Sequence, residues 1–378
     1  MVKFMRLCYI SNPNSSHTHR WLGWFVRHGH TVCLLADVPM KEAWQDTQAI
    51  DLSKIFYAPI IRFPVWSVWL RGFLRRWRPD VLHAHRVNSA GWLAASCGFH
   101  PYIVTSWGSD VFIQPQRSRL ARLLARYTLR NADLVTVNSQ AMGDQVIRLG
   151  ASADRVRNVQ FGIEMDIFNP QSLTAQQEID LRQHLSIPEK APLVLCPRAI
   201  NSIYNIDIIF QSVPLVLQRF PQVVFVFINY NADQDYKSSL DSMASDLGIE
   251  GNIHWLSPIR ERGNLAKLYH LSDVVISVPS SDGTPVSVLE AMACGRPMIV
   301  SDLPSLREYI HHGENGWLVP VGEPTVLAQH IIRFLENSDL SSDFGLKASQ
   351  VVAATNNYDV NMQQMESLYY QLIGSEKG

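Results

Sequence analysis

At 378 residues, with 47% apolar and 18% charged side chains, the chain is long enough for two globular domains, and its composition excludes disorder, collagen and coiled coils. The net charge is only −1, but residues 1–170 hold 20 basic and 11 acidic side chains, whereas residues 171–378 hold 13 and 23. The basic half predicts contact with phosphate-bearing or membrane-surface material, or else a complementary fit of two oppositely charged domains.

Short apolar segments alternate with amphipathic stretches in both halves of the chain. The first half contains RLCYI, TVCLLA, VLHAH, YIVTSW and LVTVNS, and the second half contains LVLCP, VVFVFIN, IHWL, VVISV and PMIVS. Strands that alternate with helices indicate βαβ units and parallel sheets covered on both faces. We therefore predict an α/β protein with two doubly wound, Rossmann-like domains that face a central cleft.

The boundary between the domains is expected in a polar stretch bounded by prolines, which carries no strand pattern. We predict a first domain at 1–170, a linker at 171–190 with one short helix, and a second domain at 191–357. The amphipathic segment 358–374 is expected to form a last helix, which packs back on the first domain. Ligands of such sheets bind beyond the carboxyl ends of the strands, so chemistry is expected in the loops that follow strands.

The chain is expected to work in the cytoplasm. No apolar run approaches the roughly 18 residues that a membrane span requires, and Asn12 and Pro13 interrupt the first apolar stretch too early for a signal peptide. The five cysteines stand singly in apolar contexts, without a CxxC pair, and are predicted to be reduced core residues. They are Cys8, Cys33, Cys97, Cys196 and Cys294.

The segment 274–320 is the most informative part of the sequence. The chain has no GxGxxG after a strand and no GxxxxGK[ST], so dehydrogenase and P-loop functions are excluded. Here a predicted strand leads through a Ser/Asp/Gly/Thr/Pro loop into a helix that starts near Pro285, and free N–H groups at such a helix start bind diphosphates well. Asp282 and Glu290, separated by seven residues, are expected on one side of this turn, as two polar contacts for an extended ligand.

The Asp282-x7-Glu290 pair, followed by LEAMACGRPMIVSD and NGWLVP, resembles the retaining, GT-B-fold glycosyltransferases of family four, which usually carry Glu-x7-Glu. The likeness extends over nearly the whole chain, through THRWLGWFVRHGHTV, DVLHAH, TSWGSDVF, NADLVTVNSQAM, FGIEMDIFNP and PRAINSIYNID. The resemblance implies a hexosyltransferase that moves a sugar, with retention, from a nucleotide-sugar to a glycan, lipid-linked or small-molecule acceptor. Its context is expected to be polysaccharide or lipid-linked glycan assembly. The resemblance also implies that no cofactor and no metal is needed.

By this resemblance, the second domain holds the donor. Glu290 is expected to bind the ribose hydroxyls, Asp282 the sugar hydroxyls and Arg198 the diphosphate, for which a persistent charge and a planar fork suit arginine. The remaining donor-side candidates surround these three; they are Gly283, Thr284, Val286, Ser287 and Tyr204. The catalytic candidates are Arg198, Asp282 and His85.

Three positions depart from the family pattern. Tyr204 and Asn205 stand where a basic residue often occurs, so Arg260 or Arg262 is a candidate for the missing cation. Trp107 stands where many members have an active-site histidine. Pro285 replaces a common glycine and removes an N–H donor.

The acceptor is expected to bind near the strand ends of the first domain. In DVLHAHR, His85 is nearest the strand end and is the candidate for a polar contact, whereas His83 is predicted to be a satisfied core histidine. Further candidates on this side are Ser15, His17, Trp107 and Asp110. Ser15, Ser16 or Thr18 is also a candidate cap for the helix that follows.

No metal site is predicted. His311 and His312 lie in a segment typical of a turn, and Asp233-Gln234-Asp235, although it matches a short metal-binding pattern, is expected to start a helix.

Two stretches supply most of the basic excess, 62–78 and 117–130. In the second, arginines at 119, 122, 126 and 130 form one helical face, expected opposite Leu120, Leu123, Leu124 and Tyr127. Two interpretations stay open: peripheral contact with an anionic membrane at its inner face, or a solvated helix whose apolar stripe faces the sheet. Binding of nucleic acid is not expected, because no recognition module is present.

Two other functions stay open beside the transferase. One is a sugar-nucleotide epimerase or hydrolase of the same fold, and the other is a non-catalytic paralogue that binds the sugar nucleotide.

Overall fold

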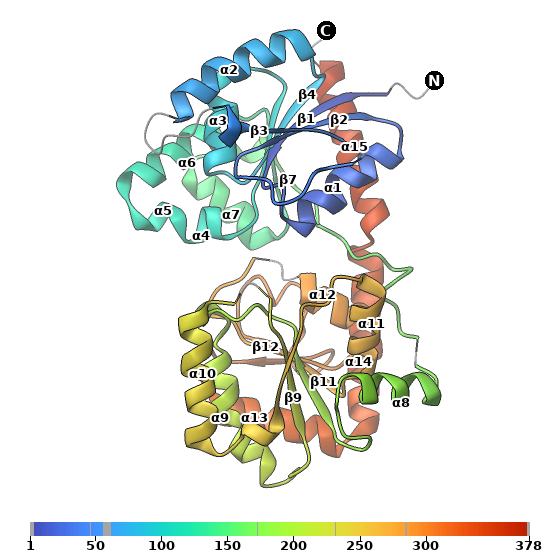
Figure 1. The fold of residues 1–378 in the computed structure, drawn as a ribbon. Coiled ribbons are helices and arrows are strands. Elements are labelled where there is room, and N and C mark those ends of the chain that lie inside the picture. The colour runs from blue at the N-terminus through green and yellow to red at the C-terminus, as the bar shows by residue number, and fades with distance from the viewer. Residues whose placement is uncertain are drawn as a thin grey trace. The chain divides into compact units, whose positions relative to one another are not determined.

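The computed structural model describes residues 4–45, 47–55, 62–171, 173–230, 232–283 and 286–375. The chain forms two compact units (Figure 1): Met1–Phe161 with Asp359–Gly378, and Gly162–Tyr358. The predicted linker 171–190 therefore belongs to the second unit, and the chain returns to the first unit at its end. Within the described ranges, no helix combines the length and the apolar character needed to cross a membrane.

The described part of the first unit contains a seven-stranded parallel sheet in the order β3-β2-β1-β4-β5-β6-β7. Its strands are β1 (Arg6–Ser11), β2 (Thr31–Ala36), β3 (Gln48–Asp51), β4 (Val81–His85), β5 (Tyr102–Thr105), β6 (Leu134–Val137) and β7 (Val156–Asn158). Its helices are α1 (Ser16–Arg27), α2 (Arg62–Trp77), α3 (Ser89–Cys97), α4 (Ser109–Phe112), α5 (Gln114–Arg117), α6 (Arg119–Asn131), α7 (Gln140–Leu149) and α15 (Tyr358–Ser375), with short 3₁₀ turns η1 (Leu52–Lys54) and η2 (Ala153–Arg155).

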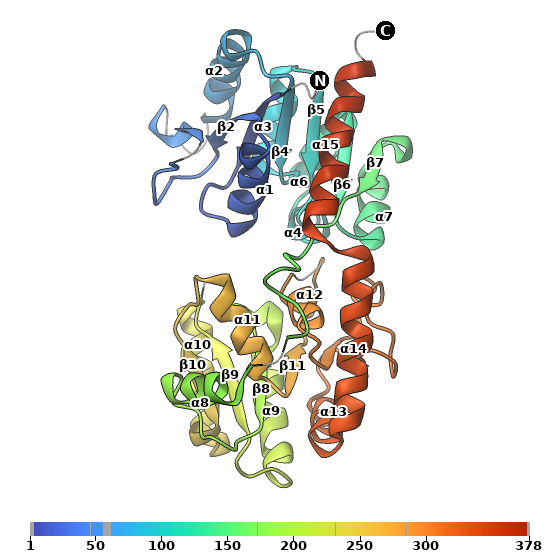
Figure 2. The ribbon, with the colours of Figure 1, turned by 90° about the vertical axis from the view of Figure 1, so that its right-hand side faces the viewer.

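Helix α15 packs on the first unit (Figure 2), and buried polar contacts hold it there. Tyr369 is fully buried, and its hydroxyl hydrogen-bonds with Tyr9 of β1 at 2.9 Å and with Nδ1 of His83 at 2.6 Å. Nearer the start of the helix, Trp24 Nε1 donates to Asp359 at 2.9 Å. A buried polar group costs free energy unless it is paired, so these bonds fix the position at which the helix docks.

The structure contradicts the expected orientation of helix α6. Its buried residues are Ala125, Thr128 and Leu129. Leu120 and Leu123 are instead 64% and 62% exposed. Consecutive helical residues are separated by about 100°, so each of these leucines, one position after an arginine, lies beside that arginine and not opposite it.

The second unit contains, among the described residues, a six-stranded parallel sheet in the order β10-β9-β8-β11-β12-β13. Its strands are β8 (Leu193–Cys196), β9 (Val224–Ile228), β10 (Ile253–Leu256), β11 (Val274–Ser277), β12 (Met298–Ser301) and β13 (Trp317–Val319). Its helices are α8 (Ala175–His184), α9 (Ile206–Leu217), α10 (Gln234–Leu247), α11 (Arg262–Leu271), α12 (Val286–Ala293), α13 (Pro324–Glu336) and α14 (Ser338–Thr355), with 3₁₀ turns η3 (Ser202–Tyr204) and η4 (Glu250–Asn252).

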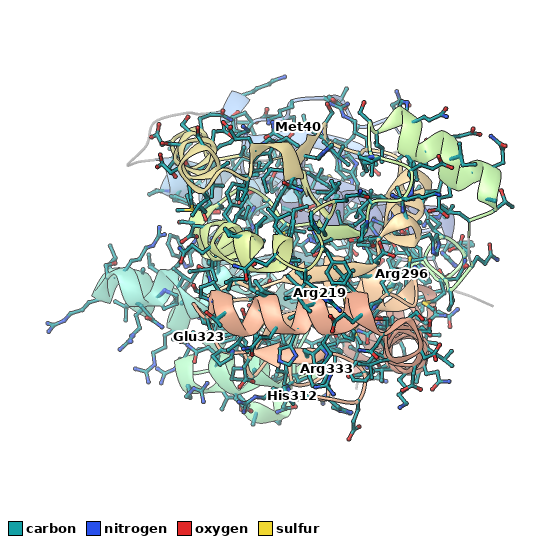
Figure 3. All side chains as sticks on the ribbon, turned by 90° about the horizontal axis from the view of Figure 1, so that it is seen from below. Met40, Arg219, Arg296, His312, Glu323 and Arg333 are labelled. Atoms are coloured by element: carbon teal, nitrogen blue, oxygen red, sulfur yellow. The ribbon has the colours of Figure 1, made fainter. Side chains whose placement is uncertain are left out.

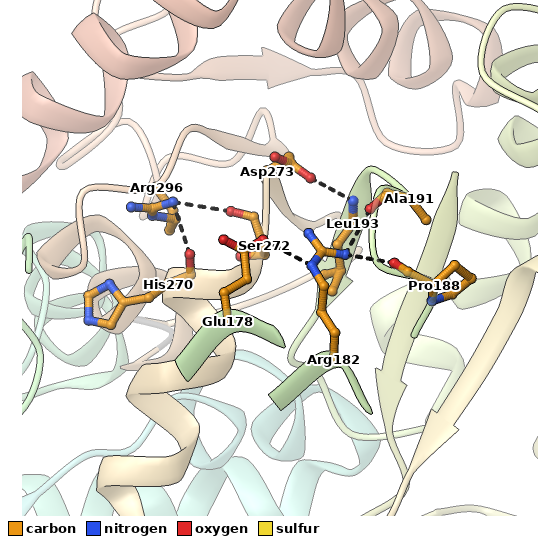
Figure 4. A network of polar contacts seen from close by, with 9 residues as sticks. All are labelled: Glu178, Arg182, Pro188, Ala191, Leu193, His270, Ser272, Asp273 and Arg296. Atoms are coloured by element: carbon orange, nitrogen blue, oxygen red, sulfur yellow. Dashed lines mark hydrogen bonds and ion pairs between the residues drawn. The ribbon is translucent and has the colours of Figure 1, made fainter. Parts of the chain in front are cut away.

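A polar network ties α8 to the start of the second sheet (Figure 4). Arg182 pairs with Glu178 and donates to the carbonyls of Pro188 and Ala191, while Asp273 accepts from the backbone N–H of Leu193. These bonds satisfy backbone groups at the entry of β8, so the segment predicted as a linker is a fixed part of this unit.

Two arginines of the second unit, Arg333 of α13 and Arg219, contact an aromatic ring and a carboxylate, respectively (Figure 3). The Arg333 guanidinium lies 4.7 Å from the centre of the Trp317 ring, and Arg219 pairs with Glu336 at 2.6 Å. The Arg219 and Glu336 side chains are 67% and 38% exposed, so this ion pair contributes little to stability.

Helix α14 approaches the end of α12 closely enough to require a glycine. A Cβ at Gly345 would lie 2.0 Å from the carbonyl oxygen of Gly295, which is a backbone atom and cannot move aside cheaply. This contact fixes α12, the helix that follows the Asp282 loop.

Replacing Gly345 with alanine is expected to lower the free energy of unfolding by at least about 2 kcal/mol, because the added methyl group overpacks two backbones. Gly72, inside α2, is the matched control, since a Cβ there meets no atom within 4 Å. Gly72→Ala should stabilise the protein by up to about 1 kcal/mol. Chemical denaturation of both variants checks this, and equal effects would contradict the packing argument.

In each sheet the strand order reverses at one point. This point lies between β1 and β4 in the first unit and between β8 and β11 in the second. In open parallel sheets, ligands bind outside the carboxyl ends of the strands at such a switch point. The loops after β1 and β4, and after β8 and β11, are therefore the places to look for function.

Candidate active site

Arg198 and Asp282 meet at the switch point of the second unit. Arg198 follows β8, and Asp282 lies in the loop after β11. Arg198 Nη2 donates to Asp282 Oδ2 at 2.6 Å, and its Nη1 donates to Ser287 Oγ at 3.0 Å. The sequence thus predicted three residues that the fold brings together from positions more than eighty residues apart.

The charged side chain of Arg198 is almost completely buried. The residue is 8% exposed, and its guanidinium lies 4.2 Å from the centre of the Tyr204 ring. Burial has the largest single effect and lowers the pKa of Arg198, but Asp282, Tyr204 and Tyr230 together raise this pKa above its ordinary value. Arg198 is therefore a permanent cation at the strand end, packed on the Tyr204 ring.

Two loops that form this site are tied to each other. Asn205 has a left-handed backbone (φ 50°), and its side chain donates to the carbonyl of Val278 at 2.8 Å and accepts from Ser280 Oγ at 3.0 Å. Ser305 Oγ donates to the backbone carbonyl of Asp282 at 2.8 Å. The loop after β11 is thus held from two sides.

Helix α12 begins at Val286, one residue before Ser287. The first N–H groups of a helix lack partners within it, and they carry the positive end of the helix dipole, so this end suits an anion. Gly283 is buried in the loop before it. Thr284 and Pro285 lie outside the described residues.

Glu290 is buried further along α12, 4% exposed, between two donors. Arg262 Nη2 donates to Glu290 Oε1 at 3.1 Å, and the Tyr269 hydroxyl donates to Oε2 at 3.1 Å. Arg262 also pairs with Glu164, and its guanidinium lies 4.7 Å from the centre of the Phe168 ring. A carboxylate held in this way has a fixed orientation.

The sequence did not predict most of these contacts around Glu290. It identified Arg262 only as one of two alternatives for contact with the diphosphate, whereas the structure places it against Glu290 and Glu164. Arg260, the other alternative, lines a hollow of about 740 Å³ between α8, β10 and α11. None of Arg198, Asp282 and Glu290 lines that hollow.

In the first unit, His85 lies at the carboxyl end of β4 in a cluster of aromatic rings. It is 1% exposed; its Nδ1 hydrogen-bonds with Ser11 Oγ at 3.1 Å, and its Nε2 has no hydrogen-bond partner among the described residues. The rings of Trp21 and Trp107 lie 5.3 and 5.5 Å from its ring. Burial, with contributions from Arg86 and His17, lowers the pKa of His85 to about 3. This imidazole is therefore neutral near pH 7.

The other acceptor-side candidates lie around this cluster. His17 stacks on Phe161 with ring centres 4.8 Å apart, and its ring centre lies 5.6 Å from that of Trp107. Ser15 is the N-cap residue of α1, but its side chain makes no capping hydrogen bond. The cap predicted from the sequence is thus not formed by Ser15.

Asp110 orients the backbone of the neighbouring loops. It is buried and accepts from the backbone N–H groups of Val87, Trp107 and Gly108 at 2.7, 3.1 and 2.8 Å. Burial raises the pKa of its carboxyl group, against the effect of these hydrogen bonds. Asp110 thereby fixes the backbone around Trp107.

The remaining polar motifs are structural, as predicted. Both ring nitrogens of His83 are bonded, Nδ1 to Tyr369 and Nε2 to Thr105 at 2.6 Å, which confirms a satisfied core histidine. The Asp233 side chain caps α10 by accepting from the N–H groups of Asp235 and Tyr236, so this motif starts a helix.

Acid is expected to destabilise the first unit through His85. The unfolded chain binds a proton at this residue below about pH 6.5, whereas the folded chain does so only near pH 3, so stability is lost as pH falls between these values. At pH 5 the cost is about 2 kcal/mol. In His85→Gln, the loss of unfolding free energy between pH 7 and pH 5 should shrink by that amount. Urea denaturation checks this, with His311→Gln as the surface control; an unchanged pH dependence in His85→Gln would contradict it.

Comparison with known proteins places the chain among glycosyltransferases. The family model for glycosyl transferases group 1 matches residues 177–351, and the model for glycosyl transferase 4-like domains matches residues 6–139. N-acetyl-alpha-D-glucosaminyl L-malate synthase of Bacillus anthracis is 22% identical over 79% of this chain and 76% of its own length. D-inositol 3-phosphate glycosyltransferase of Corynebacterium glutamicum is 25% identical over 79% and 73%.

Solved structures share the fold of both units. HepE of Anabaena, crystallised with UDP and glucose, superposes with a TM-score of 0.82 at 18% identity, over 97% of this chain and all of its own. Sucrose-phosphate synthase of Thermosynechococcus elongatus superposes with a TM-score of 0.83 at 19% identity, over 98% of this chain and all of its own.

Proposed function

The chain belongs to the glycosyl transferases group 1 family, with the GT-B fold, and from this premise we propose that its second unit binds a nucleotide-sugar at Arg198, Asp282 and Glu290. The first unit then binds the acceptor. The observation that carries the proposal is the meeting of Arg198, Asp282 and Ser287 at the switch point, with Glu290 on the same helix as Ser287.

The donor's diphosphate is placed between Arg198 and the start of α12. Arg198 contributes a fixed charge, and the N–H groups of Val286 and Ser287 contribute dipoles, so negative charge that develops on the leaving group is stabilised without rearrangement. The carboxylate of Glu290 accepts from the ribose hydroxyls. Asp282 accepts from hydroxyls of the sugar with the oxygens that Arg198 leaves open.

The transfer step retains the configuration of the sugar. The bond between the anomeric carbon and the diphosphate oxygen breaks, and a bond from the acceptor hydroxyl oxygen forms on the same face. The proton of that hydroxyl passes to the leaving diphosphate oxygen, which gives a glycoside and a nucleoside diphosphate. The chain's own residues orient the donor and stabilise its leaving group.

His85 and Trp107 are proposed to contact the sugar or the acceptor. The neutral His85 offers its Nε2, and Trp107 offers an indole N–H without a hydrogen-bond partner among the described residues. An aromatic surface suits the apolar face of a sugar ring, which fits a glycan or a lipid-linked sugar as acceptor.

UDP-sugars are the first donors to test. The solved structure of Anabaena HepE contains UDP, and so does a structure of Staphylococcus aureus TarM. A thermal-shift screen of UDP-, GDP- and ADP-sugars should give a higher melting temperature with one nucleotide class, because a ligand that binds only the folded state stabilises it. No shift with any sugar nucleotide would contradict donor binding.

A second candidate function rests on two departures from the family pattern. Trp107 replaces a common histidine, and Tyr204 leaves Arg198 without a basic neighbour in its loop. A non-catalytic paralogue would bind the donor but release no nucleotide with any acceptor. An epimerase or hydrolase would convert the donor without an acceptor. Incubation with donor alone, and then with a glycan acceptor library, distinguishes the three functions.

We also propose that the protein works on the cytoplasmic side. The five cysteines are all buried free thiols, which suits a reducing compartment.

A further inference from the structure

One surface of the first unit carries arginines without acidic neighbours on the same helices. Helices α2, α3, α5 and α6, which lie wholly within the described ranges, hold nine arginines and no aspartate or glutamate. Most of these arginines are exposed; we define the basic face by Arg71, Arg75, Arg76, Arg117, Arg119, Arg122, Arg126 and Arg130. In Figure 3, nitrogen-tipped side chains extend from the turquoise helices into solvent.

The helices that carry the basic face lie side by side (Figure 1). Arg71 of α2 donates to the carbonyl of Ser96 in α3 at 2.6 Å, and the Tyr127 hydroxyl of α6 donates to the carbonyl of Ala95 at 3.3 Å. Helices α2 and α6 therefore flank the same turn of α3. None of the ion pairs found among the described residues involves an arginine of this face.

Large apolar side chains stand among these arginines, exposed to solvent. Leu120 and Leu123 are 64% and 62% exposed, Tyr127 is 45% exposed, and Val68 of α2 is 70% exposed. These residues do not contribute to the core, which α6 contacts through Ala125 and Leu129. A helix surface that combines arginines with exposed leucines is typical of interfacial helices, which attract anionic headgroups and place apolar side chains just below them.

We propose that the basic face docks the protein on an anionic lipid surface, with Leu120 and Leu123 inserted at the headgroup boundary. The charge of the face complements anionic headgroups, and the apolar side chains gain from leaving water. A nucleic acid would use the arginines but would leave the leucines exposed, so the combination favours lipid. This inference concerns the surface of the first unit and does not depend on the proposed reaction.

Vesicle co-sedimentation tests the proposal with the full chain. Binding is expected to phosphatidylcholine vesicles that contain about a third phosphatidylglycerol, and not to pure phosphatidylcholine. Raising the salt from about 0.1 to about 0.5 M should weaken it. Arg122→Gln/Arg126→Gln should reduce the partition coefficient about 25-fold, because each basic residue near an anionic surface contributes about fivefold.

A second pair of variants separates insertion from charge. Leu120→Ser/Leu123→Ser keeps every arginine and should reduce the partition coefficient about tenfold, at high salt as well as low. Arg27→Gln/Arg157→Gln, in α1 and β7, removes the same charge from residues that are not part of the basic face, and this variant should bind as the wild type does. Melting temperatures of all variants show whether they fold.

Three outcomes would overturn the proposal. One is equal binding to neutral and anionic vesicles, or none to either. Another is an equal loss of vesicle binding in the Arg27→Gln/Arg157→Gln control, which would mean that only the net charge of the protein matters. The third is concentration-dependent self-association that Leu120→Ser/Leu123→Ser abolishes while vesicle binding persists, because the leucines would then serve contact between copies of the chain.

Discussion

Replacing Arg198 with alanine is expected to lower kcat by about 100- to 1000-fold. Removing one preorganised donor to a developing negative charge has an effect of this size, and the Tyr204 loop offers no basic residue that would substitute for it. Steady-state kinetics with saturating donor and acceptor measures the loss. Arg198→Lys keeps the charge but loses the planar guanidinium that spans Asp282 and Ser287. Its kcat should therefore lie between those of the wild type and Arg198→Ala.

Stability must be separated from chemistry in this test, because alanine at 198 leaves Asp282 without its ion-pair partner. Asp282→Asn, combined with Arg198→Ala, removes that charge and should restore the melting temperature but not kcat. Arg219→Ala is the surface control, since Arg219 also pairs with a carboxylate, that of Glu336. Wild-type kcat in a folded Arg198→Ala variant would remove Arg198 from the mechanism.

Replacing Glu290 with glutamine is expected to raise the Kd of the nucleotide about 10- to 100-fold, with a smaller change in kcat. A hydrogen bond from a hydroxyl to a carboxylate is worth about 1.5–3 kcal/mol, and the amide keeps the shape while it loses the charge. Isothermal titration should show that this variant no longer distinguishes a ribonucleotide from its 2′- or 3′-deoxy analogue.

Glu164→Gln is the matched control for Glu290. Both carboxylates pair with Arg262, but only Glu290 lies on α12. If Glu290 binds ribose directly, Glu164→Gln should change the Kd by less than about fivefold. Equal losses in the two variants would mean that the Arg262 cluster acts only as structural support.

The sequence predicted the fold well, because parallel strands buried on both faces form apolar runs that alternate with helices. The runs LVLCP and VVISV became β8 and β11, and their order in the chain placed Arg198 and Asp282 at strand ends. Since the carboxyl ends of parallel strands lie at one edge of a sheet, proximity of these two residues followed from topology before any side chain was placed.

The contacts around Glu290 were harder to predict. Arg262 and Tyr269 lie on another helix, α11, and which of its residues face α12 depends on how the two helices pack and not on any pattern within either. Asn205 carries a local signal for the turn before α9, because asparagine favours the left-handed backbone that it adopts here. Its bonds to Val278 and Ser280 are long-range and have no counterpart in the local sequence.

Helix α6 shows where periodicity misleads. The arginines and the leucines both repeat at helical spacing, and the leucines were expected opposite the arginines. In one of the two interpretations left open, they faced the sheet. The sheet instead receives Ala125 and Leu129, since α6 packs close to α3 and small residues allow that approach. The side that a helix buries depends on its neighbours, and the exposed leucines therefore point to a function.

The most direct test of the donor site is a crystal structure of the chain with UDP. The account predicts that the ribose hydroxyls lie within hydrogen-bond distance of Glu290, and that the diphosphate contacts Arg198 and the backbone N–H groups of Val286 and Ser287. UDP bound elsewhere, for example in the hollow beside α8 and β10, with Arg198 still closed on Asp282, would contradict it.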